Sequence, residues 1–188
     1  MHQTIRQIEE KLKGQMTYSR YRHTQGVMYT ASALAMRYSC NIRKAMLAGL
    51  LHDCAKCIPA EEMLRLCERY QVSLSSHEKA HPPLIHAKLG AALAREEYGV
   101  KEAEVLDAIT WHTTGRANMS LLEKIIFVAD YIEPNRPAFE GIDLARAACF
   151  RDIDEGVWLV SGQSLRHLKQ RGISIDRKTE ETYEFYHR

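Results

Sequence analysis

The stretch LLHDCAK, residues 50–56, places a histidine and an aspartate side by side at the end of an apolar, helix-forming segment. A buried carboxylate costs free energy unless it is paired with a cation or bound to a metal. The same kind of interruption recurs in other apolar helical segments of the chain. Four histidines and two aspartates interrupt apolar segments in this way: His23, His52, Asp53, His86, His112 and Asp130.

A single metal centre would satisfy all six of these side chains together. Each unpaired polar group in a core costs about 1–3 kcal/mol, and a charge costs more. Any one of the histidines, taken alone, could be an ordinary core residue with a hydrogen-bond partner. Six unrelated interruptions would be expensive, so the group as a whole predicts a polynuclear metal site. The remaining histidines lie in polar or terminal surroundings: His2, His77, His81, His167 and His187.

The pair His52 and Asp53 sets a geometric condition on this site. Neighbouring residues on a helix diverge by about 100°. The two side chains can therefore reach two adjacent metals only if the helix ends there, which the turn before Pro59 permits. Asp53 is the natural bridging ligand because a carboxylate has two oxygens. Four imidazoles and two carboxylates without a thiolate favour Fe, Mn, Co or Ni over a structural zinc site, although Zn also remains open.

The composition is that of an ordinary globular domain. The chain has 188 residues, 45% of them hydrophobic and 27% charged, and its net charge of +2 is too small for a nucleic-acid coat protein. No apolar segment approaches the length of roughly 18 residues that a membrane span needs. The cysteine count is odd, which favours reduced thiols in a cytoplasmic protein, and the Cys54–Cys57 pair is interpreted as buried small hydrophobes.

Hydrophobic periodicity is helical nearly throughout, which predicts an all-α fold. The longer helices are expected at about 19–36, 42–53, 84–98, 101–112 and 141–170, with loops at 71–83 and 133–140. A capping box at Ser120 and Glu123 opens a further helix that runs to Pro134. We expect a single domain over residues 1–188, with its core at about 18–135 and C-terminal helices at 141–188.

The order H…HD…H…H…D resembles the HD-domain metal-dependent phosphohydrolase superfamily. Four segments are similar to one subfamily, the YqeK-type bis(5′-nucleosyl)-tetraphosphatases, which cleave diadenosine tetraphosphate symmetrically: YSRYRHTQGV, LAGLLHDCAK, HAKLGAALAREEYGV and AITWHTTGRANMSLLEKIIFVADYIEPNR. This resemblance implies a helical bundle around a dinuclear metal centre, usually iron. It implies that His23, His52, Asp53 and Asp130 hold one metal, and that Asp53, His86 and His112 hold the other.

Such a centre has a defined chemistry. Two divalent cations facing two carboxylates leave about two positive charges for a hydroxide and a substrate phosphate. The metal pair lowers the pKa of a shared water and stabilises charge on the phosphoryl oxygens, so no protein nucleophile is required. A phospho-cysteine intermediate at Cys54 is disfavoured because no phosphate-cradling glycine loop follows it.

Several side chains are candidates for contact with phosphate. Lys56 follows Asp53 by three residues, and Arg20 precedes His23 by three. Asp53, Lys56 and Arg116 are the expected catalytic residues, and the expected substrate contacts are Arg20, Lys56, Thr113, Thr114, Arg116 and Arg136. Gly115 permits the turn that would bring Arg116 over the metals. Lys88 is expected to face away, and the loop 71–83, with His77 and His81, is open to interpretation as a lid or as plain surface.

The leading hypothesis is a hydrolase that splits a dinucleoside polyphosphate into two nucleoside diphosphates. Alternatives are a phosphatase or phosphodiesterase acting on other nucleotides, a non-catalytic nucleotide sensor, and an interaction module with a structural metal. The expected partner is a nucleotide substrate, without nucleic-acid polymer or membrane. Apolar residues in the C-terminal helices are compatible with a homodimer.

Overall fold

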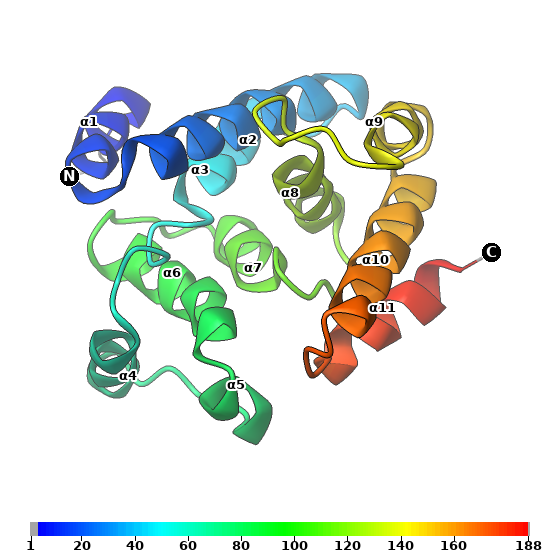
Figure 1. The fold of residues 1–188 in the computed structure, drawn as a ribbon. Helices are drawn as coiled ribbons and strands as arrows, with labels where there is room; N and C mark the ends of the chain where they lie inside the picture. Colours follow the sequence, from blue (N-terminus) through cyan, green and yellow to red (C-terminus); the bar gives the residue numbers. More distant parts are fainter. Residues whose placement is uncertain (1–3, 188) are drawn as a thin grey trace.

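The computed structural model describes residues 4–187 of the chain, so His2 lies outside it. Within this range the secondary structure is entirely helical, which confirms the predicted all-α fold (Figure 1). The helices are α1 Ile5–Gln15, α2 Tyr18–Arg37, α3 Ile42–Leu51, α4 Ala60–Arg69, α5 Ser76–Ala80, a 3₁₀ turn Pro82–Leu84, α6 Ile85–Glu96, α7 Ala103–Trp111, α8 Leu121–Ile132, α9 Ile142–Arg151, α10 Ile153–Gln170 and α11 Arg177–Tyr186.

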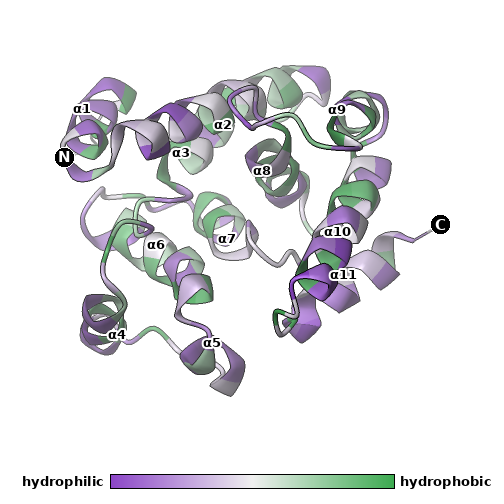
Figure 2. Cartoon of the chain, viewed as in Figure 1, coloured by the Kyte–Doolittle hydropathy of each residue, from purple (hydrophilic) through white to green (hydrophobic). Residues whose placement is uncertain are grey.

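The centre of the molecule is formed by α3, α7 and α8, with the long helix α2 packed along α3 and α8. Apolar residues are concentrated on these central helices, whereas α4 and α5 are largely polar (Figure 2). The backbones of α2 and α3 approach closely, because a Cβ atom on Gly49 would lie only 2.9 Å from the Cα of Met28. This close packing brings the His23 region of α2 beside the end of α3.

Helix α3 ends at Leu51, with His52 at its C-cap and turns extending through Cys57. Asp53 therefore lies outside the regular helix. This meets the condition for His52 and Asp53, although adjacent in the sequence, to reach two adjacent metal ions. The expected helix over 42–53 is thus shorter by two residues at its C-terminal end.

The predicted helix over 141–170 is wrong, because the structure has two helices there. Asp152 has an extended backbone (φ −141°, ψ 118°) and caps α10, accepting hydrogen bonds from the backbone N–H groups of Asp154 and Glu155. Both helices bury apolar residues in the same core. The apolar pattern therefore continues across the break and conceals it.

The segment 71–83 is also more ordered than a loop, since it contains α5. A capping box begins this helix: the Ser75 hydroxyl accepts from the Glu78 N–H at 3.1 Å, and the Glu78 carboxylate accepts from the Ser75 N–H at 2.7 Å. Lys88 binds Glu78 at 2.7 Å, so it faces away from His86. Among the described residues, no helix combines the length and the apolar character needed to cross a membrane.

Candidate metal centre and adjoining cavity

Five helices bring the six candidate ligands together. His23 lies on α2, His86 in the first turn of α6 and Asp130 in the last turn of α8. His112 is the C-cap of α7, and the His52–Asp53 pair follows α3. The four histidines and Asp53 are each at most 8% exposed, so the cluster is buried at the point where the helices meet.

Each imidazole has its Nδ1 held by an acceptor. The Nδ1 of His52 lies 2.7 Å from the Gly49 carbonyl, and that of His112 lies 2.7 Å from the Ile109 carbonyl. His86 bonds to Pro83 O in the same way, and His23 bonds to the Glu133 carboxylate. A carbonyl oxygen only accepts, so Nδ1 carries the proton and Nε2 presents a lone pair to the cluster.

Asp53 divides the cluster into two sides. Its Oδ2 lies 3.8 Å from His23 Nε2 and 3.5 Å from His52 Nε2. Its Oδ1 lies 3.2 Å from His86 Nε2 and 3.7 Å from His112 Nε2. Asp130 is on the first side, with Oδ1 3.0 Å from His23 Nε2. The two oxygens of Asp53 thus face two different sets of imidazoles, which is the arrangement of a bridging carboxylate.

The spacing of the donor atoms fits metal ions. Adjacent ligands on an ion bound at about 2.1 Å are about 3 Å apart, and several of these pairs have that separation. The Nε2 atoms of His86 and His112 lie 3.1 Å apart with their lone pairs facing, an arrangement that is repulsive without a cation. The buried Nε2 atoms of His23 and His52 have no hydrogen-bond partner within the described part of the chain. The donor set therefore fits divalent metal binding, and two of its subsets, His23–His52–Asp130 and His52–Asp53–His112, have the geometry to hold an ion.

The electrostatics keep the two carboxylates ionised and one imidazole neutral. Burial by itself raises the pKa of the Asp53 carboxyl, but the imidazoles of His52, His112 and His86 hold that pKa well below its usual range. Burial likewise opposes ionisation of Asp130, yet His23, His52 and Arg136 lower its pKa. Burial lowers the pKa of His86 to about 4, with help from His112 and Lys56. Both aspartates are thus anionic donors at neutral pH.

Three cationic side chains reach the cluster from its edge. Arg20 donates to Asp53 Oδ2 at 2.7 Å, and Arg136 donates to Asp130 Oδ1 at 2.7 Å. The Lys56 ammonium lies 3.2 Å from both ring nitrogens of His86. These three of the six expected substrate contacts therefore lie where an anion approaching the ligands would meet them.

The HTTGR segment is placed only partly as expected. The Thr113 hydroxyl is 3.2 Å from His112 Nε2, whereas the Thr114 hydroxyl donates to the Gly115 carbonyl. Arg116 does not reach over the ligands, because its Nε donates to Glu123 at 2.6 Å. Gly115 makes the turn with a left-handed φ of 64°. The sequence interpretation treated Glu123 only as a helix cap and so missed its second role as the partner of Arg116.

A cavity of about 830 Å³ opens beside the cluster. Thr113 and Arg136 line its inner end, and Tyr131, Phe139 and Gln163 line its walls. Its far wall is formed by residues 163–179, from α10 to the start of α11, and His81 and Leu84 close another edge. The cavity lies within the 300–1,000 Å³ that small-molecule sites usually occupy.

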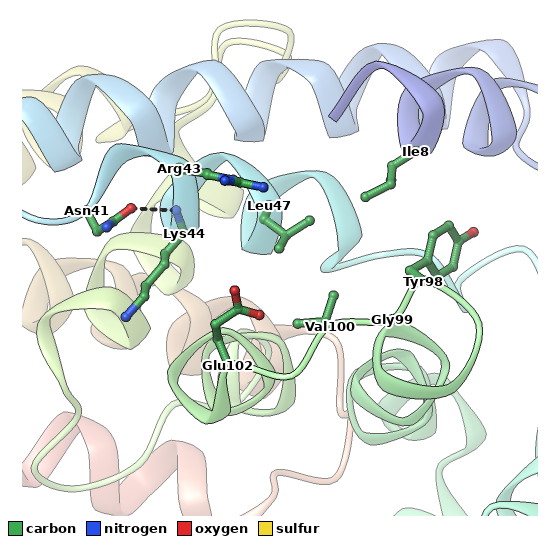
Figure 3. A pocket seen from close by; sticks show the side chains of 9 residues that line it. All are labelled: Ile8, Asn41, Arg43, Lys44, Leu47, Tyr98, Gly99, Val100 and Glu102. Atoms are coloured by element: carbon green, nitrogen blue, oxygen red, sulfur yellow. Dashed lines mark hydrogen bonds between the residues drawn. The ribbon is translucent and has the colours of Figure 1, made fainter. Parts of the chain in front are cut away.

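A smaller cavity of about 310 Å³ lies elsewhere, between α1, α3 and the segment that precedes α7 (Figure 3). Ile8, Leu47 and Val100 form its apolar part, and Arg43 and Glu102 flank it. Unlike the larger cavity, which Thr113 and Arg136 line, this one is lined by none of the candidate ligands or substrate contacts, so it is separate from the site.

Two parts of the site were missed in the sequence. Glu133, which is 1% exposed, binds His23; in the sequence it is an acidic residue directly after an apolar helix, inside the last of the four segments that carry the family resemblance. The cavity walls gave no signal, because Tyr131, Phe139 and Gln163 come from separate segments without a common motif.

The structure also disfavours Cys54 as a nucleophile. Its thiol donates to the Gly90 carbonyl, and burial raises its pKa to about 12. The reactive thiolate is therefore scarce at neutral pH.

Comparison with known proteins identifies relatives along most of the chain. Residues 20–135 match the family model described as HD domain. The chain is 46% identical over 147 residues to the symmetrical bis(5′-nucleosyl)-tetraphosphatase of Bacillus subtilis (strain 168), which covers 78% of this chain and 77% of that protein. It is 42% identical over 172 residues to the protein of the same name from Halalkalibacterium halodurans, with 92% and 91% covered. The crystal structure of a predicted HD superfamily hydrolase involved in NAD metabolism from Clostridium acetobutylicum superposes with a TM-score of 0.94 at 36% identity, covering 99% of this chain and 98% of that one.

Proposed function

This chain belongs to the HD-domain family, and on that premise we propose that it hydrolyses diadenosine tetraphosphate symmetrically into two molecules of ADP. The names of the two curated relatives support the substrate. The observation that carries the proposal is the position of the Asp53 carboxylate. Its two oxygens face two different sets of imidazoles, beside a cavity large enough for a nucleotide.

The two sides of Asp53 support a proposal of two metal positions. One would be held by His23, His52, Asp53 and Asp130, and the other by Asp53, His86 and His112. Iron is the expected metal, with Mn, Co, Ni or Zn as alternatives. A divalent pair bound there supplies an activated water and a centre of positive charge for the phosphoryl oxygens.

The chain's own residues then bind and orient the polyphosphate. Arg20, Lys56 and Arg136 present cationic groups at the rim of the cluster, where charge develops during phosphoryl transfer. Thr113 offers a hydroxyl at the junction between cluster and cavity. Thr114 and Arg116 stand further along the same segment, and we retain them as candidate substrate contacts.

The cavity would receive a nucleoside. It begins at Thr113 and Arg136, so a phosphate chain reaching the cluster leads directly into it. Tyr131 and Phe139, whose ring centroids are 5.5 Å apart, offer aromatic surface on one wall. An adenine base packed against such a wall would be shielded from water.

Product identification tests the proposal. Protein reconstituted with Fe²⁺ or Mn²⁺ is incubated with diadenosine tetraphosphate, and the nucleotides are separated by ion-exchange chromatography. ADP alone is the expected product, and AMP with ATP would contradict symmetric cleavage.

Control variants connect that activity with the cluster. His52→Ala and Asp53→Ala should lose bound metal by elemental analysis and lose activity together. Chelation of the wild type should abolish turnover while most helicity by circular dichroism remains, because the helices have their own apolar core. Unfolding on chelation would instead indicate a structural metal, and nucleotide binding by metal-loaded protein without any turnover would indicate a sensor.

A further inference from the structure

His23 differs from the other three histidines in how its ring is oriented. His52, His86 and His112 each use the carbonyl of the residue three positions earlier, namely Gly49, Pro83 and Ile109. His52 and His112 cap the C-terminal ends of α3 and α7, where carbonyls lack helical partners, and His86 bonds back to the 3₁₀ turn Pro82–Leu84 that precedes α6. His23 lies inside α2, where the neighbouring carbonyls already accept helical hydrogen bonds. Its partner is a residue 110 positions away, the Glu133 carboxylate, at 3.0 Å.

The Glu133 carboxylate is itself held firmly in place. It is 1% exposed, and its Oε2 accepts hydrogen bonds from the backbone N–H and the side-chain amide of Asn135, at 2.7 and 3.0 Å. The Asn135 amide also donates to the Arg22 carbonyl on α2. These bonds compensate the buried charge and fix the carboxylate relative to His23.

Gly26 leaves the space that this carboxylate occupies. It lies one turn after His23 on α2, and a Cβ atom at this position would be 2.1 Å from Glu133 Oε2. Any side chain here would force Glu133 to move. Gly26 therefore provides a way to displace the carboxylate while leaving Glu133 in the sequence.

Cationic side chains reach both sides of the cluster, so they do not distinguish one from the other. The Lys56 ammonium lies 3.2 Å from the ring nitrogens of His86, and on the His23 side Arg20 donates to Asp53 Oδ2 and Arg136 to Asp130 Oδ1. On the His23 side, a carboxylate bound to Nδ1 makes Nε2 a stronger metal donor and adds a nearby negative charge. The two sides are thus unequal even though they share Asp53.

We propose that Glu133 is a positioning residue that makes the His23–His52–Asp130 side the tighter of the two metal positions, with the His86–His112 side weaker and more readily exchanged. This inference rests on the proposed two-metal function.

Calorimetric titration of the metal-free protein with Co²⁺ tests the inference, because Co²⁺ also gives visible absorption bands that report each filled position. The wild type should show two separate binding events. Glu133→Ala and Gly26→Ala should weaken the tighter event by about 10- to 100-fold and leave the weaker event nearly unchanged. Glu133→Gln keeps an acceptor for His23 without the charge, so it should fall between these variants and the wild type.

Glu78→Gln is the matched control, because Glu78 is also a buried glutamate but is held by Ser75 and Lys88, away from the ligands. It should titrate like the wild type, and thermal unfolding of each metal-free variant checks that the fold is intact. If Glu133→Ala does not fold, Glu133→Gln and Gly26→Ala decide the question. Two equal events in the wild type, or loss of only the weaker event in the variants, would overturn the inference while leaving the hydrolase proposal standing. A wild type that binds one ion in total would overturn the two-metal function itself.

Discussion

The ligand cluster and the cavity beside it are built from different parts of the chain. Every candidate ligand lies between His23 and Asp130, within the HD domain. The far wall of the cavity comes from residues 163–179, beyond that domain. The cluster presents charge and a set of metal ligands, whereas the cavity presents shape and aromatic surface. We therefore expect that mutations in the two regions can alter phosphoryl chemistry and substrate selection separately.

The largest effect is expected from Lys56→Met, which removes a charge from the cluster while keeping the length of the side chain. The Lys56 ammonium lies at the cluster edge, 3.2 Å from the His86 ring. Loss of one preorganised cation facing the reacting phosphoryl group should lower kcat by about 10²- to 10³-fold. Steady-state kinetics with diadenosine tetraphosphate, on protein of verified metal content, measures this.

Lys44→Met provides the comparison for that variant. Lys44 is a lysine that pairs with Glu104 and lies beside the smaller, separate cavity, away from the cluster. It should leave kcat unchanged. An unchanged kcat in Lys56→Met would remove this lysine from the catalytic group and assign it to the structure of the turn after α3.

An intermediate effect is expected from Ser164→Trp, which changes only the cavity. Ser164 lines the cavity from α10, so an indole there would occupy the space assigned to the nucleoside. The kcat/KM for diadenosine tetraphosphate should fall by about 10- to 100-fold, mainly through KM. Inhibition by inorganic phosphate, which can reach the cluster without filling the cavity, should keep its strength.

Lys169→Trp tests whether the added indole acts through the cavity. Lys169 is exposed on the same helix and does not line the cavity. Its kinetics should match the wild type. Equal weakening of substrate and phosphate binding in Ser164→Trp would show that the two regions are not independent.

The same division explains how much could be predicted from the sequence. The ligand cluster was visible because each charged or imidazole side chain interrupts an apolar helix, and such an interruption needs a compensating partner. The residues lining the cavity are ordinary members of amphipathic helices. Gln163 and Phe139, for example, acquire a role only when α10 packs beside α8, a tertiary contact that no local pattern encodes.

Local signals also set the limits of the fold prediction. The capping box at Ser120 was recognised because a strong apolar helix follows it, whereas the equivalent box at Ser75 begins a helix of five residues and was missed. The break at Asp152 was missed because α9 and α10 bury their apolar faces in one core. A helix end can be concealed whenever the apolar period continues through it.

The smallest effect concerns Arg116, which the sequence assigned to the phosphates and the structure pairs with Glu123. Burial raises the pKa of the Glu123 carboxyl, but the hydrogen bonds from Arg116 and Ser120 outweigh it, so the pKa lies below its ordinary value. The folded state therefore favours the ionised form. The resulting stabilisation is present above the unfolded pKa of about 4.3 and is lost as the pH falls through the lower folded value. Glu123→Gln should lower the free energy of unfolding by about 1 kcal/mol at pH 7, because Arg116 is partly exposed and the pair is partly screened.

Urea unfolding followed by circular dichroism at pH 7 and at pH 3.5 measures this difference, which should shrink at the lower pH. Glu62→Gln, at an exposed pair with Arg65, should change the unfolding free energy by less than about 0.5 kcal/mol at both pH values. A stability loss with unaltered kcat and KM would assign Arg116 to holding the turn between α7 and α8. If Glu123→Gln instead lowers kcat and leaves stability unaltered, Arg116 would be assigned to the phosphates. Arg116 would then belong to the cluster, because Glu123 would be holding the Arg116 side chain in position for the substrate.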